Sequence, residues 1–194
     1  MKHLIFKSLI FFSAYFLLIN NISCQQTTSA NTNNSLRVVI LRHGEKPDEG
    51  ENLSCQGLNR ALQLSNVLYN KYKLVDNIYV PELKTGKSKG TGEARMYQTV
   101  VPYAIKYNLV IGTLFEVGDE VSMAKSILKK SGTVLVVWEH KTIPALVQAL
   151  GVSAGKLKWD GDDFDSIWIV TFKDGQAVLS YDKENINPSA DCKW

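Results

Sequence analysis

Apolar segments that suit buried strands alternate with amphipathic segments that suit helices along most of this chain. The strand-like segments are LRVVIL (36–41), NIYVPE (77–82), LVIGTLF (109–115) and GTVLVVW (132–138). The helical segments that follow them are 55–72, 95–108, 120–130 and 142–151. This alternation is typical of a parallel sheet covered by helices. We therefore predict an α/β fold, a single three-layer domain with a mostly parallel central sheet and helices on both faces.

Several residues mark the limits of these elements. Ser54 is suited to cap the first helix, because its side chain can accept a hydrogen bond from a backbone N–H. Pro102 lies inside the second helical segment and predicts a break or kink there, because proline has no N–H to donate. Near the C-terminus, SIWIVTF (166–172) and QAVLSYD (176–182) flank a Lys-Asp-Gly turn, which predicts an antiparallel hairpin.

The first 35 residues differ in kind from the rest. A basic start, MKHLIFK, and an apolar run at 8–19 precede a polar run that ends at Ser35. This pattern predicts an export signal over 1–24, a flexible polar tether over 25–35 and one folded domain over 36–194. The apolar run is shorter than the roughly 20 residues of a membrane-spanning helix. The protein is therefore expected outside the cytoplasm, in the periplasm or anchored to the envelope.

Export also changes how the three cysteines are interpreted. Cys24 stands where a bacterial lipoprotein carries its lipidated cysteine, so lipidation and simple cleavage nearby are both open, and a lipid there is the one membrane contact expected. Thiols outside the cytoplasm tend to pair, which favours a Cys55–Cys192 disulfide over two unrelated buried thiols. No second cysteine or histidine lies at ligand spacing from either one, so neither is predicted to bind a metal.

Two of the predicted parallel strands end in a histidine. The first runs into Arg42 and His43, and the fourth runs into His140. Because parallel strands of one sheet end at the same edge, both histidines would emerge there, and they would face each other if the strands are neighbours. Arg95, at the start of the second helix, can project into the same cleft, where helix N-terminal amides also favour anions.

The predicted cleft therefore holds two guanidinium groups and two imidazoles, a combination that suits a phosphoryl group. Guanidinium forks pair with phosphate oxygens. A neutral imidazole is a competent nucleophile, and surrounding positive charge lowers its pKa. A small phosphoester is the predicted substrate, and this chemistry requires neither a metal ion nor another cofactor. Gly44 is expected to leave room where substrate and backbone approach closely.

Four segments together resemble the histidine phosphatase, or phosphoglycerate mutase-like, superfamily in order and spacing: LRHGEKP (41–47), LSCQGLNRA (53–61), ARMYQTVVPYA (94–104) and VVWEHKTIP (136–144). The resemblance spans about residues 36–150. It implies that His43 forms a phosphohistidine and that Arg42, Arg95 and His140 hold the phosphoryl group. Mutases of this family carry a tryptophan-rich segment after the RHG motif. This chain lacks one, which favours a metal-independent phosphoric monoester hydrolase over a mutase.

The acid that protonates the leaving oxygen is the next residue to identify. Glu116 follows the third strand and resembles the position used by the mutase branch of the family, so it is the predicted catalytic acid. Glu139 is adjacent to His140 but is expected to point away, because side chains alternate along a strand. Glu45 is expected to orient the loop after His43 rather than to react.

The connection after the second strand is longer than is usual in the family and carries three lysines, Lys84, Lys87 and Lys89. They either form a solvated loop or, with Lys87 as the candidate substrate-binding residue, contact a second anionic group of the substrate.

The number and distribution of charged residues argue against nucleic-acid binding and against an EF-hand calcium site. The 22 basic residues are spread along the chain and the net charge is only +3, which gives no support to nucleic-acid binding. The acidic segment KWDGDDFDS (158–166) lacks the later glutamate of an EF-hand and is predicted to be a surface turn. Two hypotheses remain: an exported phosphatase, or a catalytically silent envelope protein that binds a phosphorylated ligand or a protein partner. The intact arginine and histidine set favours the enzyme.

Overall fold

The computed structural model describes residues 35–83 and 93–192. The predicted export signal with Cys24, all of the predicted tether except Ser35, and the lysines at 84, 87 and 89 lie outside the described residues. Within the described ranges, no helix has the length and apolar character needed to span a membrane.

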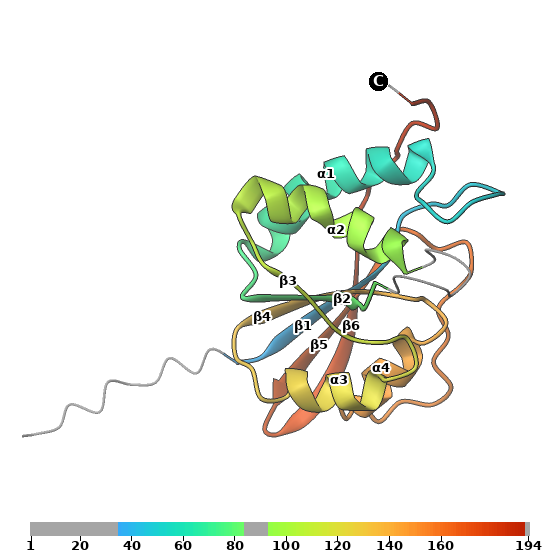
Figure 1. Ribbon diagram of the computed structural model, residues 1–194. Coiled ribbons are helices and arrows are strands. Elements are labelled where there is room, and N and C mark those ends of the chain that lie inside the picture. Colours follow the sequence, from blue (N-terminus) through green and yellow to red (C-terminus); the bar gives the residue numbers. More distant parts are fainter. Residues whose placement is uncertain (1–34, 84–92, 193–194) are drawn as a thin grey trace, which may run out of the picture. The chain divides into compact units, whose positions relative to one another are not determined.

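The described residues from 35 onward form one α/β domain around a six-stranded sheet (Figure 1). The strands are β1 (Arg37–Arg42), β2 (Asn77–Pro81), β3 (Ile111–Phe115), β4 (Thr133–Trp138), β5 (Ser166–Lys173) and β6 (Gln176–Lys183), and their order in the sheet is β3-β2-β4-β1-β5-β6. The first four strands of this order are parallel, whereas β5 is antiparallel to β1 and pairs with β6 as a hairpin. The predicted fold class is confirmed.

Helices cover both faces of the sheet. Helices α1 (Cys55–Tyr72) and α2 (Ala94–Tyr107) lie on one face, and α3 (Glu120–Ile127) and α4 (Ile143–Ala149) lie on the other (Figure 1). Because side chains alternate along a strand, β1 supplies both layers: Val39 and Leu41 pack under α1 and α2, while Val38 and Ile40 pack under α3 and α4. Each face thus has its own apolar core.

Local sequence explains most of the element boundaries. The Ser54 side chain caps α1 by accepting a hydrogen bond from the N–H of Gly57 at 3.1 Å. Of the break or kink predicted at Pro102, the break is excluded, because α2 continues through it from Ala94 to Tyr107. Val100 and Tyr103, on either side of the proline, are fully buried, so tertiary packing holds the helix together there.

The register of the sheet decides where the two histidines lie. Strands β1 and β4 are direct parallel neighbours, and Arg42, the last residue of β1, is opposite Trp138, the last residue of β4. His43 and His140 follow these two ends, so both emerge at the carboxyl edge of the sheet. The condition on which the predicted cleft depended is therefore met.

A disulfide joins Cys55, the first residue of α1, to Cys192 near the C-terminus, with the two Cα atoms 4.9 Å apart. It closes a loop of 137 residues in sequence separation. Because cross-linking such a long loop restricts the unfolded chain, we expect Cys192→Ser to lower the free energy of unfolding by about 2–4 kcal/mol. Urea denaturation of both proteins, with and without a reductant, would measure this. A wild type that loses no stability on reduction would contradict the expectation.

Candidate active site

His43 is a buried imidazole whose Nδ1 is hydrogen-bonded to the backbone and whose Nε2 is on the side of Glu139. Its side chain is 3% exposed, and its Nδ1–H donates a hydrogen bond to the Gly44 carbonyl at 2.7 Å. A carbonyl can only accept, so the proton is on Nδ1 and the lone pair is on Nε2. Burial, with a further contribution from the charge of Arg42, lowers the pKa of His43 to about 4. The ring is therefore neutral near pH 7 and can act as a nucleophile.

The loop after His43 is fixed by direct backbone packing against α1. A Cβ on Gly44 would stand 3.1 Å from the carbonyl oxygen of Gly57, and the N–H of Gly44 donates to Thr99 Oγ1 at 2.8 Å. This corrects the expectation that Gly44 makes room for substrate: the close approach is to Gly57 on α1, which in turn has no space for a side chain against Glu45.

Arg42 is a buried arginine that is held through one nitrogen of its guanidinium. Its Nη1 donates to the carbonyls of Gly161 at 2.6 Å, Asp163 at 3.2 Å and Asp160 at 3.4 Å, and its guanidinium lies 3.8 Å from the centroid of the Phe164 ring. Burial lowers the pKa of Arg42, but nearby carboxylates oppose that shift and the group stays charged. The acidic segment after Lys158 is thus a support for this arginine, a role that its sequence did not indicate.

Arg95 lies in the first turn of α2 with its side chain 13% exposed. Its Nη1 donates to the Glu51 carbonyl at 3.1 Å and is 3.6 Å from Glu51 Oε2. Its positive charge contributes to the lowered pKa of His43. Because its direct partner is Glu51, the placement of Arg95 beside Arg42 and His43 stays a prediction.

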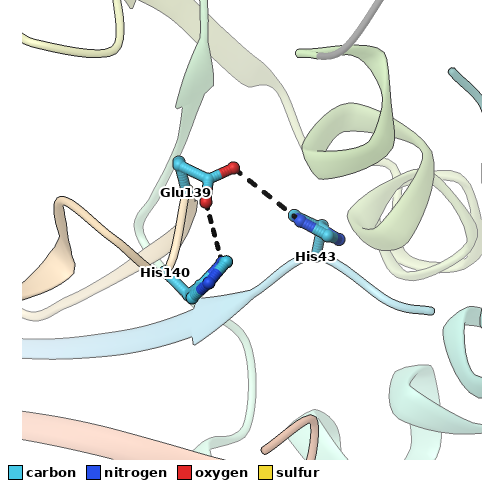
Figure 2. Close-up of side chains that lie close together, drawn as sticks. All are labelled: His43, Glu139 and His140. Carbon is cyan, nitrogen blue, oxygen red and sulfur yellow. Dashed lines mark ion pairs between the residues drawn. The ribbon is translucent and has the colours of Figure 1, made fainter. Parts of the chain in front are cut away.

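His140 and His43 face each other across Glu139 (Figure 2). The ring centroids are 6.3 Å apart, with the planes at 75°. Glu139 Oε2 is 3.9 Å from His43 Nε2, and Oε1 is 2.7 Å from His140 Nδ1, although that pair is not aligned for a hydrogen bond. The expectation that Glu139 points away was wrong. β4 ends at Trp138 and the chain turns through Glu139, so the alternation of strand side chains no longer applies.

Three of the predicted phosphate-binding residues each have a buried nitrogen without a hydrogen-bond partner among the described residues. Four buried side-chain nitrogens or oxygens in the described part of the chain make no hydrogen bond, and three of them are Arg42 Nε, Arg95 Nε and His140 Nδ1. The fourth, Ser65 Oγ, is on α1. Buried polar groups are nearly always paired in folded proteins. Three unpaired nitrogens from predicted phosphate-binding residues therefore favour an anionic ligand as their missing partner.

The same cleft has a donor set that metal ions use. One ligand atom each from His43, Glu139 and His140 lies within 4.8 Å of the others, and two imidazoles with a carboxylate suit Zn²⁺. The adjacent guanidinium of Arg42 opposes a resident cation by charge repulsion. The residues thus fit an anion better than a metal ion.

The remaining sequence candidate, Glu116, is exposed and directly follows β3. Strands β2 and β4 separate β3 from β1, so the β3 and β1 axes are roughly 14 Å apart at the usual strand spacing. His140 and Gly161 border a cavity of about 390 Å³ that Leu157, Trp159 and Lys141 also line. This cavity opens directly beside His140.

Comparison with known proteins identifies fold relatives. No protein-family model and no curated protein sequence matches the chain. Among solved structures, the protein histidine phosphatase SixA complexed with tungstate is 16% identical with a TM-score of 0.53, over 76% of this chain and 97% of that one. An Escherichia coli protein assigned as an alpha-ribazole-5'-P phosphatase is 13% identical with a TM-score of 0.54, over 82% and 99%. At these identities the likeness is one of fold.

Proposed function

Because the chain has the fold of the histidine phosphatase (phosphoglycerate mutase-like) superfamily, we propose that it is a phosphatase that hydrolyses small phosphomonoesters through a phosphohistidine on His43. One observation carries the proposal: the lone pair of His43 is on Nε2, and Arg42 Nε, Arg95 Nε and His140 Nδ1 are buried nitrogens without a hydrogen-bond partner in the described part of the chain, as expected of groups that bind an anion. The fold relatives named as phosphatases support the same class of reaction.

The reaction begins with attack of His43 Nε2 on phosphorus. The hydrogen bond from Nδ1–H to the Gly44 carbonyl keeps the lone pair on Nε2 and holds the ring in place. Arg42 and Arg95 carry positive charge to the phosphoryl oxygens, where negative charge is concentrated in the transition state. The backbone carbonyls at 160–163 fix the guanidinium of Arg42 before substrate arrives, so little reorganisation is needed.

The alcohol part of the substrate has a natural place beside His140. The cavity of about 390 Å³ is lined by the apolar Leu157 and Trp159 and by Lys141, whose charge contributes to the lowered pKa of His140. This volume suits a small organic leaving group. After the alcohol departs, water hydrolyses the phosphohistidine and inorganic phosphate leaves. The sequence-predicted acid for this reaction is Glu116.

Turnover of p-nitrophenyl phosphate by the full chain, followed by acid- and base-resolved trapping of phosphoenzyme, tests the proposal. We expect a phosphoryl group that is stable to alkali and labile to acid, as a phosphohistidine is. Binding of tungstate or phosphate without turnover of a broad phosphoester panel would instead favour a catalytically silent protein that recognises a phosphorylated ligand or partner.

The low pKa of His43 predicts an unusual acid limit for activity. Activity requires the neutral ring, which is lost as pH falls through the pKa of about 4 rather than through the ordinary value of 6.5. We therefore expect kcat/KM to change little between about pH 7 and about pH 5 on account of this group, and to fall below about pH 4. Circular dichroism at each pH would show that the protein stays folded. A half-loss of kcat/KM near pH 6.5 in folded protein would contradict the assignment.

Removal of metal ions is expected to leave activity unchanged, because nucleophile and charge stabilisation both come from side chains. Dialysis against EDTA tests this directly. Added Zn²⁺ is expected to inhibit, since His43, Glu139 and His140 can bind it at the place the phosphoryl group needs. Loss of activity after EDTA treatment, restored by added Zn²⁺, would instead indicate a metal-dependent enzyme.

The cellular location follows from the N-terminal sequence alone. We extend the proposal to an exported protein, released after cleavage of residues 1–24 or held at the envelope through a lipid on Cys24. The support is the basic and apolar pattern before Cys24. Cell fractionation of wild type and Cys24→Ser, with mass measurement of the mature N-terminus, distinguishes the two forms.

A further inference from the structure

The geometry points to Glu139 as the acid that protonates the leaving oxygen, an assignment that rests on the phosphatase function proposed above. Glu139 lies between the two histidines, with one carboxyl oxygen toward each (Figure 2). Its side chain is 22% exposed, so it belongs to the wall of the cleft rather than to the outer surface. Glu116, by comparison, follows the edge strand β3.

The position of Glu139 changes when substrate binds. Phosphorus must come within about 3–3.5 Å of Nε2 for attack, and Glu139 Oε2 now stands 3.9 Å from that atom. The carboxyl group therefore has to give way by rotation of its side chain. Because an attacking and a leaving group lie in line across phosphorus, the leaving oxygen is on the side away from His43. Rotation toward His140 and the adjoining cavity brings the carboxyl group to that side.

Glu139 must hold a proton when the substrate is bound in order to donate it. Its side chain is 22% exposed, so solvent can deliver that proton. We place the phosphoryl oxygens against the unpaired nitrogens of Arg42, Arg95 and His140, whereas the N–H of His43 stays on the Gly44 carbonyl. A neutral carboxyl group then remains next to the leaving oxygen, ready to donate.

The proton and electron changes balance over two steps. In the first, the lone pair of His43 Nε2 forms the P–N bond, the P–O bond breaks with its electron pair on the leaving oxygen, and that oxygen takes the proton of Glu139. In the second, a water oxygen attacks phosphorus while the Glu139 carboxylate accepts one of its protons, and the P–N electron pair returns to Nε2. The net reaction is phosphoester plus water to alcohol plus phosphate, with Glu139 protonated again.

A leaving-group series separates this role from a structural one. Phosphoenzyme formation is measured by rapid quench with 2,4-dinitrophenyl phosphate, whose leaving group needs no proton, and with an alkyl phosphate, whose leaving group does. For Glu139→Gln we expect the alkyl rate to fall on the order of 10²–10⁴-fold and the dinitrophenyl rate to change little. Glu139→Asp is expected to restore part of the alkyl rate. Glu49→Gln, the same change on the exposed loop after the His43 motif, is the matched control.

The outcomes distinguish this inference from the function on which it rests. No phosphohistidine in wild type would overturn the phosphatase itself. Normal phosphohistidine in wild type, together with an equal fall on both substrates in Glu139→Gln, would overturn the role of Glu139 alone. The same leaving-group pattern in Glu116→Gln, with Glu139→Gln unchanged, would assign the acid to the sequence-predicted residue. Thermal unfolding and tungstate binding of each variant control for misfolding.

Discussion

Replacing His43 with alanine is expected to lower kcat on the order of 10⁵-fold, the largest effect that any single change in this protein should have. Loss of a nucleophile removes the covalent route altogether and leaves whatever catalysis charge and binding provide. In the structure, the Nδ1–H of His43 donates to the Gly44 carbonyl, and Nε2 is on the side of the ring toward Glu139. Steady-state turnover of p-nitrophenyl phosphate measures the loss, and quench experiments should find no phosphoenzyme.

His140→Ala is the matched comparison for His43→Ala. It removes an imidazole from the same cleft, but one that we propose to contact the phosphoryl group rather than to attack it, so we expect a smaller loss of about 10²–10³-fold with phosphoenzyme still detectable. Tungstate binding checks that the anion site survives in both variants. Activity of His43→Ala equal to that of wild type would remove the proposed mechanism, and a phosphohistidine found in that variant would place the nucleophile elsewhere.

Arg60→Met is expected to lower the free energy of unfolding by roughly 3–5 kcal/mol, because it leaves the buried carboxylates of Glu45 and Glu184 without their positively charged partner. The guanidinium of Arg60 donates from Nε and Nη2 to Glu45 at 2.7–3.0 Å, and from Nη1 to Glu184 Oε2 at 2.6 Å. All three residues are less than a tenth exposed. This network ties α1 to the loop after His43 and to the segment after β6. Urea denaturation at equilibrium measures the change.

The pH dependence of this loss has a definite sign. Burial raises the pKa of Glu184 from 4.5 to about 7, so the group adds stability that is fully present below about 4.5 and is lost as pH rises through about 7. Without Arg60, the ionised carboxyl group has no cation, so the loss should be larger near pH 8 than near pH 5. Lys71→Ala, which breaks a half-exposed pair with Asp182, is the control, with an expected loss of at most about 1 kcal/mol. Equal losses in the two variants would contradict the buried-network argument.

Adding Glu184→Gln to Arg60→Met tests whether the unpaired charge of Glu184 causes the loss of stability. The second change removes one of the stranded charges, so the double variant is expected to recover part of the stability that the single variant loses. A double variant less stable than Arg60→Met would mean that packing of the side chains, rather than charge, sets the cost.

Periodicity was sufficient to predict the elements and the sheet class. The strand segment at 36–41 is apolar except for Arg37 and the helix at 55–72 has a capping serine, and both occur within a residue of the expected limits. Local rules failed at Pro102, where the missing hydrogen bond is outweighed by the burial of Val100 and Tyr103 against the sheet. That burial depends on a partner helix and on strands distant in sequence, which no local pattern contains.

The candidate active-site residues also divide into those that local sequence could predict and those that depend on tertiary structure. Arg42, His43 and His140 could be proposed from sequence because each lies at the end of an apolar strand or within two residues after it, and parallel strands end at one edge. The inward position of Glu139 could not, because it depends on where β4 stops and the chain turns. The support of Arg42 by carbonyls of Asp160, Gly161 and Asp163 was equally hidden, because backbone acceptors carry no sequence signature.

The residue types, and the ends of the strands that carry them, follow from the amino-acid sequence: basic side chains at one sheet edge, among them the candidate nucleophile His43. The tertiary structure alone decides which partners those groups meet. It directs a carboxylate between two imidazoles, leaves three nitrogens without hydrogen bonds, and buries Arg60 with two acids. The physical reason is that hydrophobic periodicity acts over a few residues, whereas pKa values and unpaired donors depend on atoms brought together from segments about a hundred residues apart.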